Sequence, residues 1–165
     1  MYVKHQQQPC PVSCVTTCIA MILNRPVEEL RPLLHDRYRE TNLSLGEILT
    51  EYGVPFEPFK STDRGLLQWV GLYLVAAPSL NIQAGMHQIL LELNEDKYVV
   101  HDPNRGRPGI KYYANPEEWQ SDDPLAVQLG GYSPEAYIPE SWLQQVYGEQ
   151  PCSKTGKPAN GATAC

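Results

Sequence analysis

The stretch HQQQPCPVSCVTTCIAMILN, residues 5–24, decides how the rest of the chain is interpreted. Its cysteines, Cys10, Cys14 and Cys18, are spaced by four residues, and a run of glutamines precedes them. Thiols in this arrangement fit a metal cluster, a packed helix, or a nucleophile at the start of a helix. The residues around each cysteine and the sequence that follows distinguish these interpretations.

The second half of this stretch has the pattern of an amphipathic helix. The apolar residues that share one helical face are Val15, Cys18, Ile19, Ile22 and Leu23, and Cys14 lies at the polar boundary of this face. Ser13 is a residue type that caps helices, and Pro11 limits extension upstream. Asn24 lies two residues before Pro26, where a helix is expected to stop. We therefore expect a helix that begins at Cys14 and ends near Asn24.

Further helices are expected in the first half of the chain and strands in the second. A helix over residues 26–36 should be kinked or restarted at Pro32. Another begins at Ser44, whose spacing from Glu47 fits a capping box, and ends near Gly53. The remaining expected elements are a short helix over 64–70, strands over 71–78, 86–93, 97–102 and 109–113, and a helix over 137–148.

Helices followed by strands indicate an α+β domain in which the helices pack on an antiparallel sheet. A chain of 165 residues is long enough for one domain with a sizeable core, which we assign to residues 1–148. Residues 149–165 are rich in Pro, Gly, Ala, Lys and Ser and are expected to form a flexible tail. Its cysteines, Cys152 and Cys165, are expected to be exposed thiols, with a disulfide under oxidising conditions as the alternative.

Composition excludes several classes of protein. The formal net charge is −6, from 13 basic and 19 acidic residues. The sequence has no basic run or stripe, so a nucleic-acid partner is not expected. No apolar run approaches ~18 residues, and none follows Lys4, so neither a membrane span nor a signal peptide is expected. Five cysteines, three of them crowded together, favour free thiols in a reducing compartment. We expect a cytoplasmic protein, or one delivered into a target cell by other machinery, whose partner is a protein or peptide.

A hairpin between the second and third strands is expected to bring a histidine and an acid together. If residues 94–95 form a two-residue turn, Leu93 lies opposite Asp96. The same register places His87 opposite Asp102, on one face of the sheet, where a carboxylate can orient the imidazole. A slip of one residue would separate the two side chains.

Cys14 has the sequence environment of a nucleophile. A thiol at the first residue of a helix lies at the positive end of the helix dipole, which lowers its pKa, and an imidazolium nearby lowers it further. A cysteine, a histidine and an acid in this relation form an acyl-transfer site. The developing oxyanion also needs a hydrogen-bond donor, which a glutamine just upstream can supply.

These residues resemble a known family. The segment QPCPVSCVTTCIAMIL, residues 8–23, looks like the nucleophile motif of the papain-like bacteriocin-processing peptidases, also called double-glycine peptidases. Gln8 and Cys14 have the spacing of that family's glutamine and catalytic cysteine, and Cys18 falls where the family often has a structural cysteine. The segment MHQILLELNEDKYVVHDPNRGRP, beginning at Met86, resembles the family's His strand and the His-Asp-Pro…Gly-Arg end of its next strand. The resemblance covers roughly residues 4–113.

The resemblance implies a papain-like fold and a cysteine endopeptidase that uses no cofactor and no metal. In this family pattern Cys14 is the nucleophile, His87 the general base, Asp102 the carboxylate that orients it, and Gln8 the oxyanion donor. The implied substrate is a protein or peptide that is cut after a small pair such as Gly-Gly. An inhibitor or immunity protein would be a further partner if the enzyme were an antibacterial toxin rather than a maturation enzyme.

The chain departs from the family beside its two central residues. Ser13 and Val15 flank the cysteine, where the family usually has an acidic or amide residue before it and Gly after it. Gln88 follows the histidine, where aromatic or Val-rich sequence is usual. These departures affect the expected substrate preference more than the expected chemistry. The transporter portions often fused to such domains are also missing, so we do not expect leader removal coupled to secretion.

Alternative roles exist for the individual residues. Cys14 could be a buried core thiol, and Cys10 could be the nucleophile, although Pro11 follows it and no Gln precedes it at the family distance. A metal site formed by the three cysteines lacks the Cys-x-x-Cys pair or paired histidines of a structural zinc site. His101 could serve as the base, but the expected register turns it to the other face of the sheet.

Alternative activities also exist. The same triad serves deamidases and acyltransferases, including toxins that modify proteins. A non-catalytic module that recognises a leader or a partner would also use the fold, but such modules often lose the cysteine or the histidine, and both are present here. Gln6 and Gln7 are alternatives to Gln8 as oxyanion donor, since only the family spacing selects Gln8.

Overall fold

The computed structural model describes residues 1–59, 67–95, 97–119 and 122–148. The helices are α1 (Cys14–Ile22), α2 (Val27–Leu30), the π-helix η1 (Arg31–His35), α3 (Asp36–Glu40), α4 (Leu45–Glu51), the 3-10 helix η2 (Pro116–Glu118) and α5 (Glu140–Tyr147). The strands are β1 (Glu57–Pro58), β2 (Gly71–Pro78), β3 (Met86–Leu93), β4 (Tyr98–His101), β5 (Tyr112–Ala114), β6 (Ala126–Gln128) and β7 (Ser133–Pro139).

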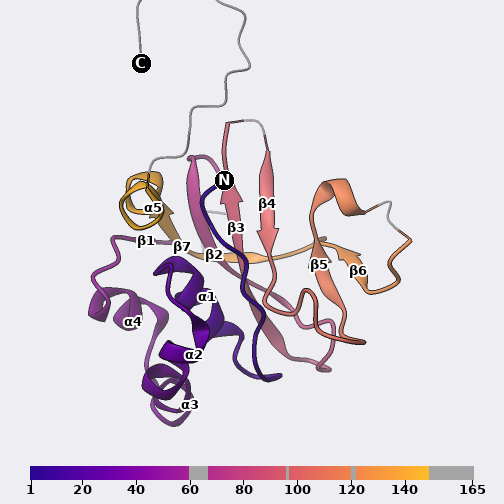
Figure 1. Cartoon of the computed structure of the whole chain (residues 1–165), viewed down its shortest axis with the longest axis horizontal. Coiled ribbons are helices and arrows are strands. Elements are labelled where there is room, and N and C mark those ends of the chain that lie inside the picture. Colours follow the sequence, from indigo (N-terminus) through magenta and orange to yellow (C-terminus); the bar gives the residue numbers. More distant parts are fainter. Residues whose placement is uncertain (60–66, 96, 120–121, 149–165) are drawn as a thin grey trace, which may run out of the picture.

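The strands form one large sheet and one small one. The large sheet is antiparallel with the order β1-β7-β2-β3-β4, and β5 pairs with β6 in parallel. Helices α1 to α4 lie together on one side of the large sheet, and the β5-β6 pair lies beyond β4 (Figure 1). The predicted α+β class, with helices on an antiparallel sheet, is confirmed at this level.

Helix α1 begins at the residue predicted to open it. Every residue from Val15 to Ile22 is buried, and the helix packs against β3. Ser13 occupies the N-cap position, but its hydroxyl donates to the carbonyl of Cys10 at 2.9 Å and caps no helical N–H. The predicted capping role of Ser13 is therefore wrong, although the position of the helix start is right. The chain leaves the helix through Asn24, whose φ of 50° is a conformation that asparagine tolerates.

Proline divides the second predicted helix as expected. Pro32 has no N–H to donate, and the chain passes from α2 through η1 into α3 around it. Helix α4 carries the predicted capping box. The Ser44 hydroxyl accepts from the Glu47 N–H at 3.2 Å, and the Glu47 carboxylate accepts from the Ser44 N–H at 2.8 Å. Gly53, with φ of 69°, follows the helix where the sequence predicts its end.

We expect Ser44→Ala to lower the free energy of unfolding by about 1 kcal/mol, because an N-cap hydroxyl is lost from α4. Glu47→Gln keeps an acceptor for the Ser44 N–H and should have a smaller effect. Urea unfolding followed by circular dichroism measures both changes. Equal destabilisation by the two variants would contradict this account of the cap.

The strand predictions are accurate at the centre of the sheet and poor at its margins. The bounds of β2 and β3 match the predicted strands, and β4 lies within its predicted range. The last predicted strand, 109–113, is displaced to β5 because Gly109 has φ of 69° and belongs to a turn. Strand β7 was not predicted, since Pro134 and Glu135 argue against a central strand. The ladder with β2 shifts register at these residues, and such an irregularity accommodates a proline.

Two apolar cores lie on the two faces of the large sheet. Alternate residues of β2 and β3 point to opposite faces, so each strand contributes to both cores. The core on the α1 side includes Cys18, Ile19, Leu72, Leu74, Leu90 and Ile138. The core on the β5-β6 side includes Tyr73, Val75, Ile89, Leu91, Val100 and Tyr113. The sheet is therefore a buried and preformed support for the residues at its strand ends.

The register of the β3-β4 hairpin differs from the predicted one by two residues. Leu93 lies opposite Tyr98 and not opposite Asp96, which is outside the described residues. The predicted direct pairing of His87 with Asp102 is therefore wrong. Side chains alternate with a period of two along a strand, so a shift of two residues keeps both side chains on the same face.

Other predictions fall wholly or partly outside the described residues. The tail over 149–165 is one of these, and so is most of the helix expected over 64–70, whose described residues, 67–70, are not helical. The expected terminal helix over 137–148 begins only at Glu140, because residues 137–139 continue β7. Among the described residues, none of the helices is long and apolar enough to cross a membrane.

Candidate active site

The predicted nucleophile and base line one cavity between α1 and the start of β3. Cys14 is the first residue of α1 and is partly exposed, while His87 is the second residue of β3 and is buried. They share a cavity of about 440 Å³ with Tyr38, Gln88 and other residues. Each of the two side chains is among the groups that shift the pKa of the other. Two residues that are 73 positions apart in the sequence therefore meet at one site.

Asp102 holds the other side of the imidazole. His87 Nε2 lies 2.6 Å from Asp102 Oδ1, and both side chains are buried. A carboxylate only accepts hydrogen bonds, so Nε2 carries the proton, and Nδ1 is the ring nitrogen left for the thiol of Cys14. Asp102 is itself fixed, because Oδ1 accepts from the Asn104 N–H and Oδ2 from the Tyr113 N–H, each at 2.7 Å.

The electrostatics of this pair favour an ionised thiol. Burial alone would raise the pKa of the Cys14 thiol, but the hydrogen bond and charge of His87, with backbone groups of Gln88 and Val15, lower it below its ordinary value. Burial likewise opposes protonation of His87, but Asp102 and Cys14 raise the pKa of His87 from 6.5 to about 9. A lowered pKa of the thiol and a raised pKa of the imidazole together favour the thiolate and imidazolium form, which is the reactive form of such a site.

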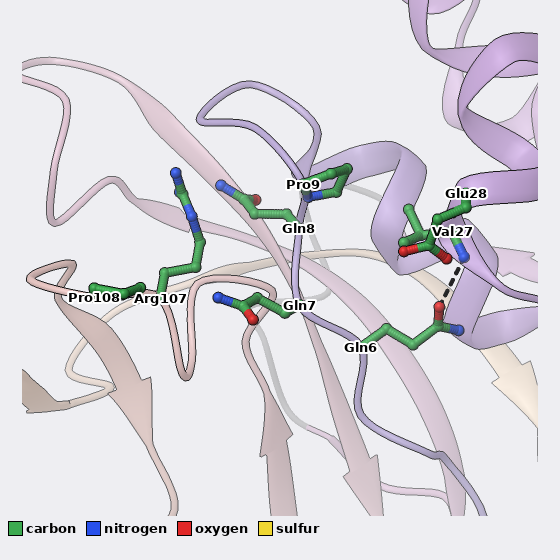
Figure 2. Close-up of a pocket in the computed structure, with 8 residues that line it drawn as sticks. All are labelled: Gln6, Gln7, Gln8, Pro9, Val27, Glu28, Arg107 and Pro108. Atoms are coloured by element: carbon green, nitrogen blue, oxygen red, sulfur yellow. Dashed lines mark hydrogen bonds between the residues drawn. The ribbon is translucent and has the colours of Figure 1, made fainter.

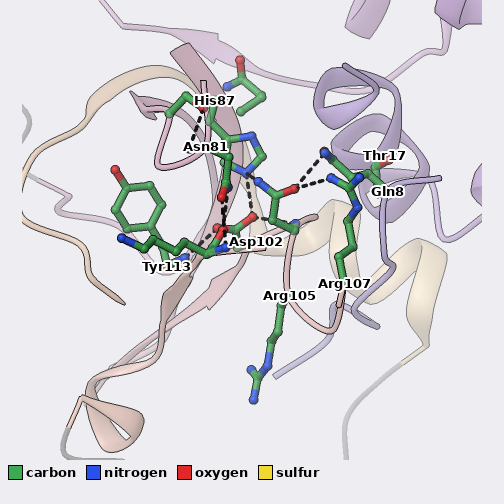
Figure 3. Close-up of polar contacts among 12 residues, drawn as sticks. Gln8, Thr17, Asn81, His87, Asp102, Arg105, Arg107 and Tyr113 are labelled. Carbon is green, nitrogen blue, oxygen red and sulfur yellow. Dashed lines mark hydrogen bonds and ion pairs between the residues drawn. The ribbon is translucent and has the colours of Figure 1, made fainter. Parts of the chain in front are cut away.

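Asn104 connects the parts of the site, and sequence reasoning missed it. Its side-chain amide nitrogen lies 3.3 Å from His87 Nε2, and its Oδ1 accepts from Gln8 Nε2 at 2.8 Å and from Arg107 Nη1 at 2.9 Å. Figure 3 shows Gln8 and Arg107 approaching one acceptor beside His87 and Asp102. The signal was available in HDPNRGR, a polar turn directly after the strand end that carries the acid.

Gln8 lies beside the triad, but it is not among the residues that line the cavity of Cys14 and His87. Its side chain is buried, and one amide N–H donates to Asn104 Oδ1. Its Oε1 has no hydrogen-bond partner among the described residues. The Gln8 N–H also donates to the carbonyl of Pro103 at 2.8 Å. The second side-chain N–H of Gln8 is left for another acceptor.

The N-terminal segment is fixed in place before it reaches Gln8. The N–H groups of Tyr2 and Val3 donate to the buried carboxylate of Glu92. Gln6 donates to the carbonyl of Arg25 at 2.7 Å and accepts from the N–H of Val27 at 2.8 Å. Figure 2 shows Gln6 turned toward α2 while Gln7 and Gln8 extend from the opposite side of the segment. This difference separates the three glutamines, since among the described residues only Gln8 of the three is hydrogen-bonded to residues 102–108, the Asp102 loop.

The other two cysteines of the opening stretch have different surroundings. Cys18 is fully buried, donates to the carbonyl of Gln88 at 3.4 Å, and has its pKa raised well above the ordinary value by burial. Burial opposes ionisation of Cys10, but hydrogen bonding to Ser13 and Val12 lowers its pKa overall. His87 acts on Cys14 and not on Cys10 in these interactions. No cluster of three potential ligands for a metal exists among the described residues.

His101, the alternative base, faces away from the cavity. Its Nε2 lies 3.0 Å from Glu92 Oε2, on the sheet face opposite to His87. It belongs to the contact that anchors the N-terminal segment. The structure therefore brings Cys14, His87 and Asp102 together, places Gln8 next to them through Asn104, and keeps His101 apart.

Comparison of the chain with protein-family models, with curated proteins and with solved structures gives no match.

Proposed function

We propose that this protein is a cysteine peptidase with a papain-like arrangement of catalytic residues. The observation that carries the proposal is that His87 contacts the buried Asp102 through Nε2 and lines one cavity with Cys14, with which it shares pKa shifts in opposite directions. A purely structural role for His87 in the core would not explain why it lies near both an ionisable thiol at a helix start and a buried carboxylate. The sequence resemblance to the double-glycine peptidases names the same residues.

In the proposed mechanism the Cys14 thiolate attacks a peptide carbonyl. His87 then gives its Nδ1 proton to the leaving amine, and a thioester with Cys14 remains. Water, deprotonated by His87, hydrolyses the thioester and regenerates the thiolate. Asp102 keeps the imidazole in the orientation and tautomer that both steps require, and stabilises the imidazolium.

The oxyanion of the tetrahedral intermediate needs donors on the other side of the carbonyl. The N–H of Cys14, at the start of α1, is one such donor, because the first helical N–H groups have no partner within the helix. The second N–H of the Gln8 amide is the other. The hydrogen bond from Gln8 to Asn104 holds the amide in the orientation that this role requires.

We expect Gln8→Ala to lower kcat by about 10²- to 10³-fold while leaving the alkylation rate of Cys14 nearly unchanged. Removal of an oxyanion donor destabilises the tetrahedral intermediate, whereas alkylation of a thiolate passes through no oxyanion. Gln7→Ala is the matched control, since Gln7 is exposed and forms no contact with Asn104. A Gln8→Ala variant with normal turnover would remove Gln8 from the mechanism.

For the substrate we propose a protein or peptide cut after a small pair such as Gly-Gly, on the basis of the resemblance. A maturation enzyme and an antibacterial toxin would both use this chemistry, and a toxin would be accompanied by a tight inhibitor protein. Neither biological role is favoured by a contact within the site.

The product masses from a peptide library that includes Gly-Gly sequences test this function. A peptidase gives two fragments whose masses sum to the substrate plus one water, and Cys14→Ala gives none. Deamidation leaves the peptide intact with an amide converted to an acid, and acyl transfer attaches one fragment to an added amine. Binding without any product would support the non-catalytic module instead.

A further inference from the structure

Arg107 extends from the Asp102 loop to the space around the catalytic residues. It lines the cavity that contains Cys14 and His87, and also a second cavity of about 480 Å³ lined by Gln7 and Gln8. Arg107 as a residue is half-buried, and its Nη1 donates to Asn104 Oδ1 at 2.9 Å. Figure 2 shows the side chains of these two glutamines extending toward Arg107. The hydrogen bond anchors one nitrogen and leaves the others for a further acceptor.

Arg107 has no anionic partner among the residues that the structure describes. The ion pairs of Lys and Arg among the described residues involve other cations, and Arg105, two residues earlier, pairs with Glu118. The group that Arg107 contacts, the amide oxygen of Asn104, is neutral. A guanidinium with only a neutral acceptor retains most of its capacity to bind a carboxylate.

The cavity beside Arg107 is apolar at its rim and preformed. Val12, Ile82 and Met86 line it with exposed fractions of 46%, 46% and 63%. The loop that carries Ile82 is held by reciprocal hydrogen bonds between Asn81 and the backbone of Lys111. A rigid apolar rim beside a guanidinium fits an extended peptide better than a polar small molecule.

We propose that Arg107 is a specificity-determining residue that binds a carboxylate of the substrate close to the scissile bond. The carboxylate is an acidic side chain or the C-terminal carboxylate of the peptide. The proposal rests on the proposed peptidase function, since it assigns a substrate class to the same site. The experiments below give different results if Arg107 does not bind a carboxylate and if Cys14 and His87 do not form a catalytic pair.

The first test compares alkylation of Cys14 by iodoacetate, which carries a carboxylate, with alkylation by neutral iodoacetamide. Site-resolved mass spectrometry measures both rates in the full chain, and their ratio reports attraction of the carboxylate. We expect Arg107→Gln to lower the ratio at least about threefold, and Arg107→Lys to retain most of it. Lys97→Gln is the matched control. It makes the same change in net charge, but Lys97 precedes β4 whereas Asp102 follows it, so the ratio should be unchanged.

A purely structural role for Arg107 would change both alkylation rates together, and the ratio would stay constant. That result, with a fast Cys14 in the wild type, overturns the proposal and leaves the peptidase function intact. A Cys14 that is slow with both reagents in the wild-type chain overturns the proposed function and this inference with it.

A second test identifies the source of the carboxylate. Matched peptides carry Glu or Gln at each position near the cleaved bond and end in a free carboxylate or an amide. We expect wild-type kcat/KM to be about tenfold higher for the preferred acid than for its neutral partner, and Arg107→Gln to remove the preference. A preference at a Glu position identifies a side chain, and one at the free end identifies the C-terminal carboxylate. Equal rates for every acid and neutral pair in the wild type overturn the proposal.

Discussion

Replacement of Cys14 by alanine is expected to reduce peptide cleavage at least about 10⁴-fold, the largest effect of any single change in the chain. Cys14 forms the covalent bond in the proposed mechanism, so no other group takes over its role. Stability should change little, because Cys14 is partly exposed at the first turn of α1 and alanine favours helices. Cleavage kinetics and thermal unfolding measured on the same preparation separate the two effects.

Cys10→Ala is the matched control for this variant. Cys10 lies in the turn before α1, with its thiol outside the interaction with His87. We expect it to retain most of the wild-type kcat. Loss of cleavage in Cys10→Ala with normal cleavage in Cys14→Ala would transfer the nucleophile to Cys10 and contradict the assignment.

Asp102→Asn is expected to lower kcat by about 10²- to 10⁴-fold. The carboxylate accepts three hydrogen bonds, from His87, Asn104 and Tyr113, and an amide cannot accept all three. The imidazole then loses the partner that fixes its tautomer, and the pKa of His87 should fall from about 9 toward its ordinary value. The pH dependence of kcat/KM measures this shift directly.

A second consequence of Asp102→Asn is structural. One buried donor is left without an acceptor, which costs about 1–3 kcal/mol in the free energy of unfolding. Asp36→Asn, at an exposed position at the start of α3, removes the same charge and should change neither quantity appreciably. Unchanged turnover and an unchanged pH profile in Asp102→Asn would show that this carboxylate does not orient His87.

The central elements of the fold are predictable because local pattern and tertiary contacts agree there. The start of α1 at Cys14, the α4 capping box and the apolar runs of β2 and β3 are local signals that agree with the structure. Strand β7 has no such signal, since its prolines oppose a strand, and pairing with β2 and β1 together with burial of Ile138 stabilises it. Local preference fails where a distant partner decides the conformation.

The His87-Asp102 contact was predicted on the basis of an incorrect register. The predicted turn places the two residues opposite each other, whereas β4 ends at His101 and Asp102 lies just beyond it. The contact forms because the shift preserves the sheet face and because the Asn104 and Tyr113 N–H groups fix the carboxylate. Sequence spacing alone contains no information on these two backbone donors.

The polar network around Gln8 was also beyond sequence reasoning. The spacing of Gln8 from Cys14 indicates a donor near the thiol, but the link through Asn104 to Arg107 joins residues almost a hundred positions apart. Such a link depends on where the N-terminal segment crosses the Asp102 loop. The contacts of Tyr2, Val3 and Gln6 that fix this crossing have no local signature.

The most direct test of the central claim is the alkylation rate of each cysteine as a function of pH, in the wild type and in His87→Ala. The lowered pKa of Cys14 and the raised pKa of His87, about 9, predict that fast alkylation of Cys14 begins at a lower pH than for an ordinary thiol. In His87→Ala this fast alkylation should be lost, and the rate should rise only near an ordinary thiol pKa of about 8.5 or above. Cys18, which is buried, should stay slow throughout and serves as the internal reference. A Cys14 that titrates as an ordinary thiol in the wild type, or that is unaffected by the loss of His87, would contradict the thiolate-imidazolium pair and the peptidase mechanism that depends on it.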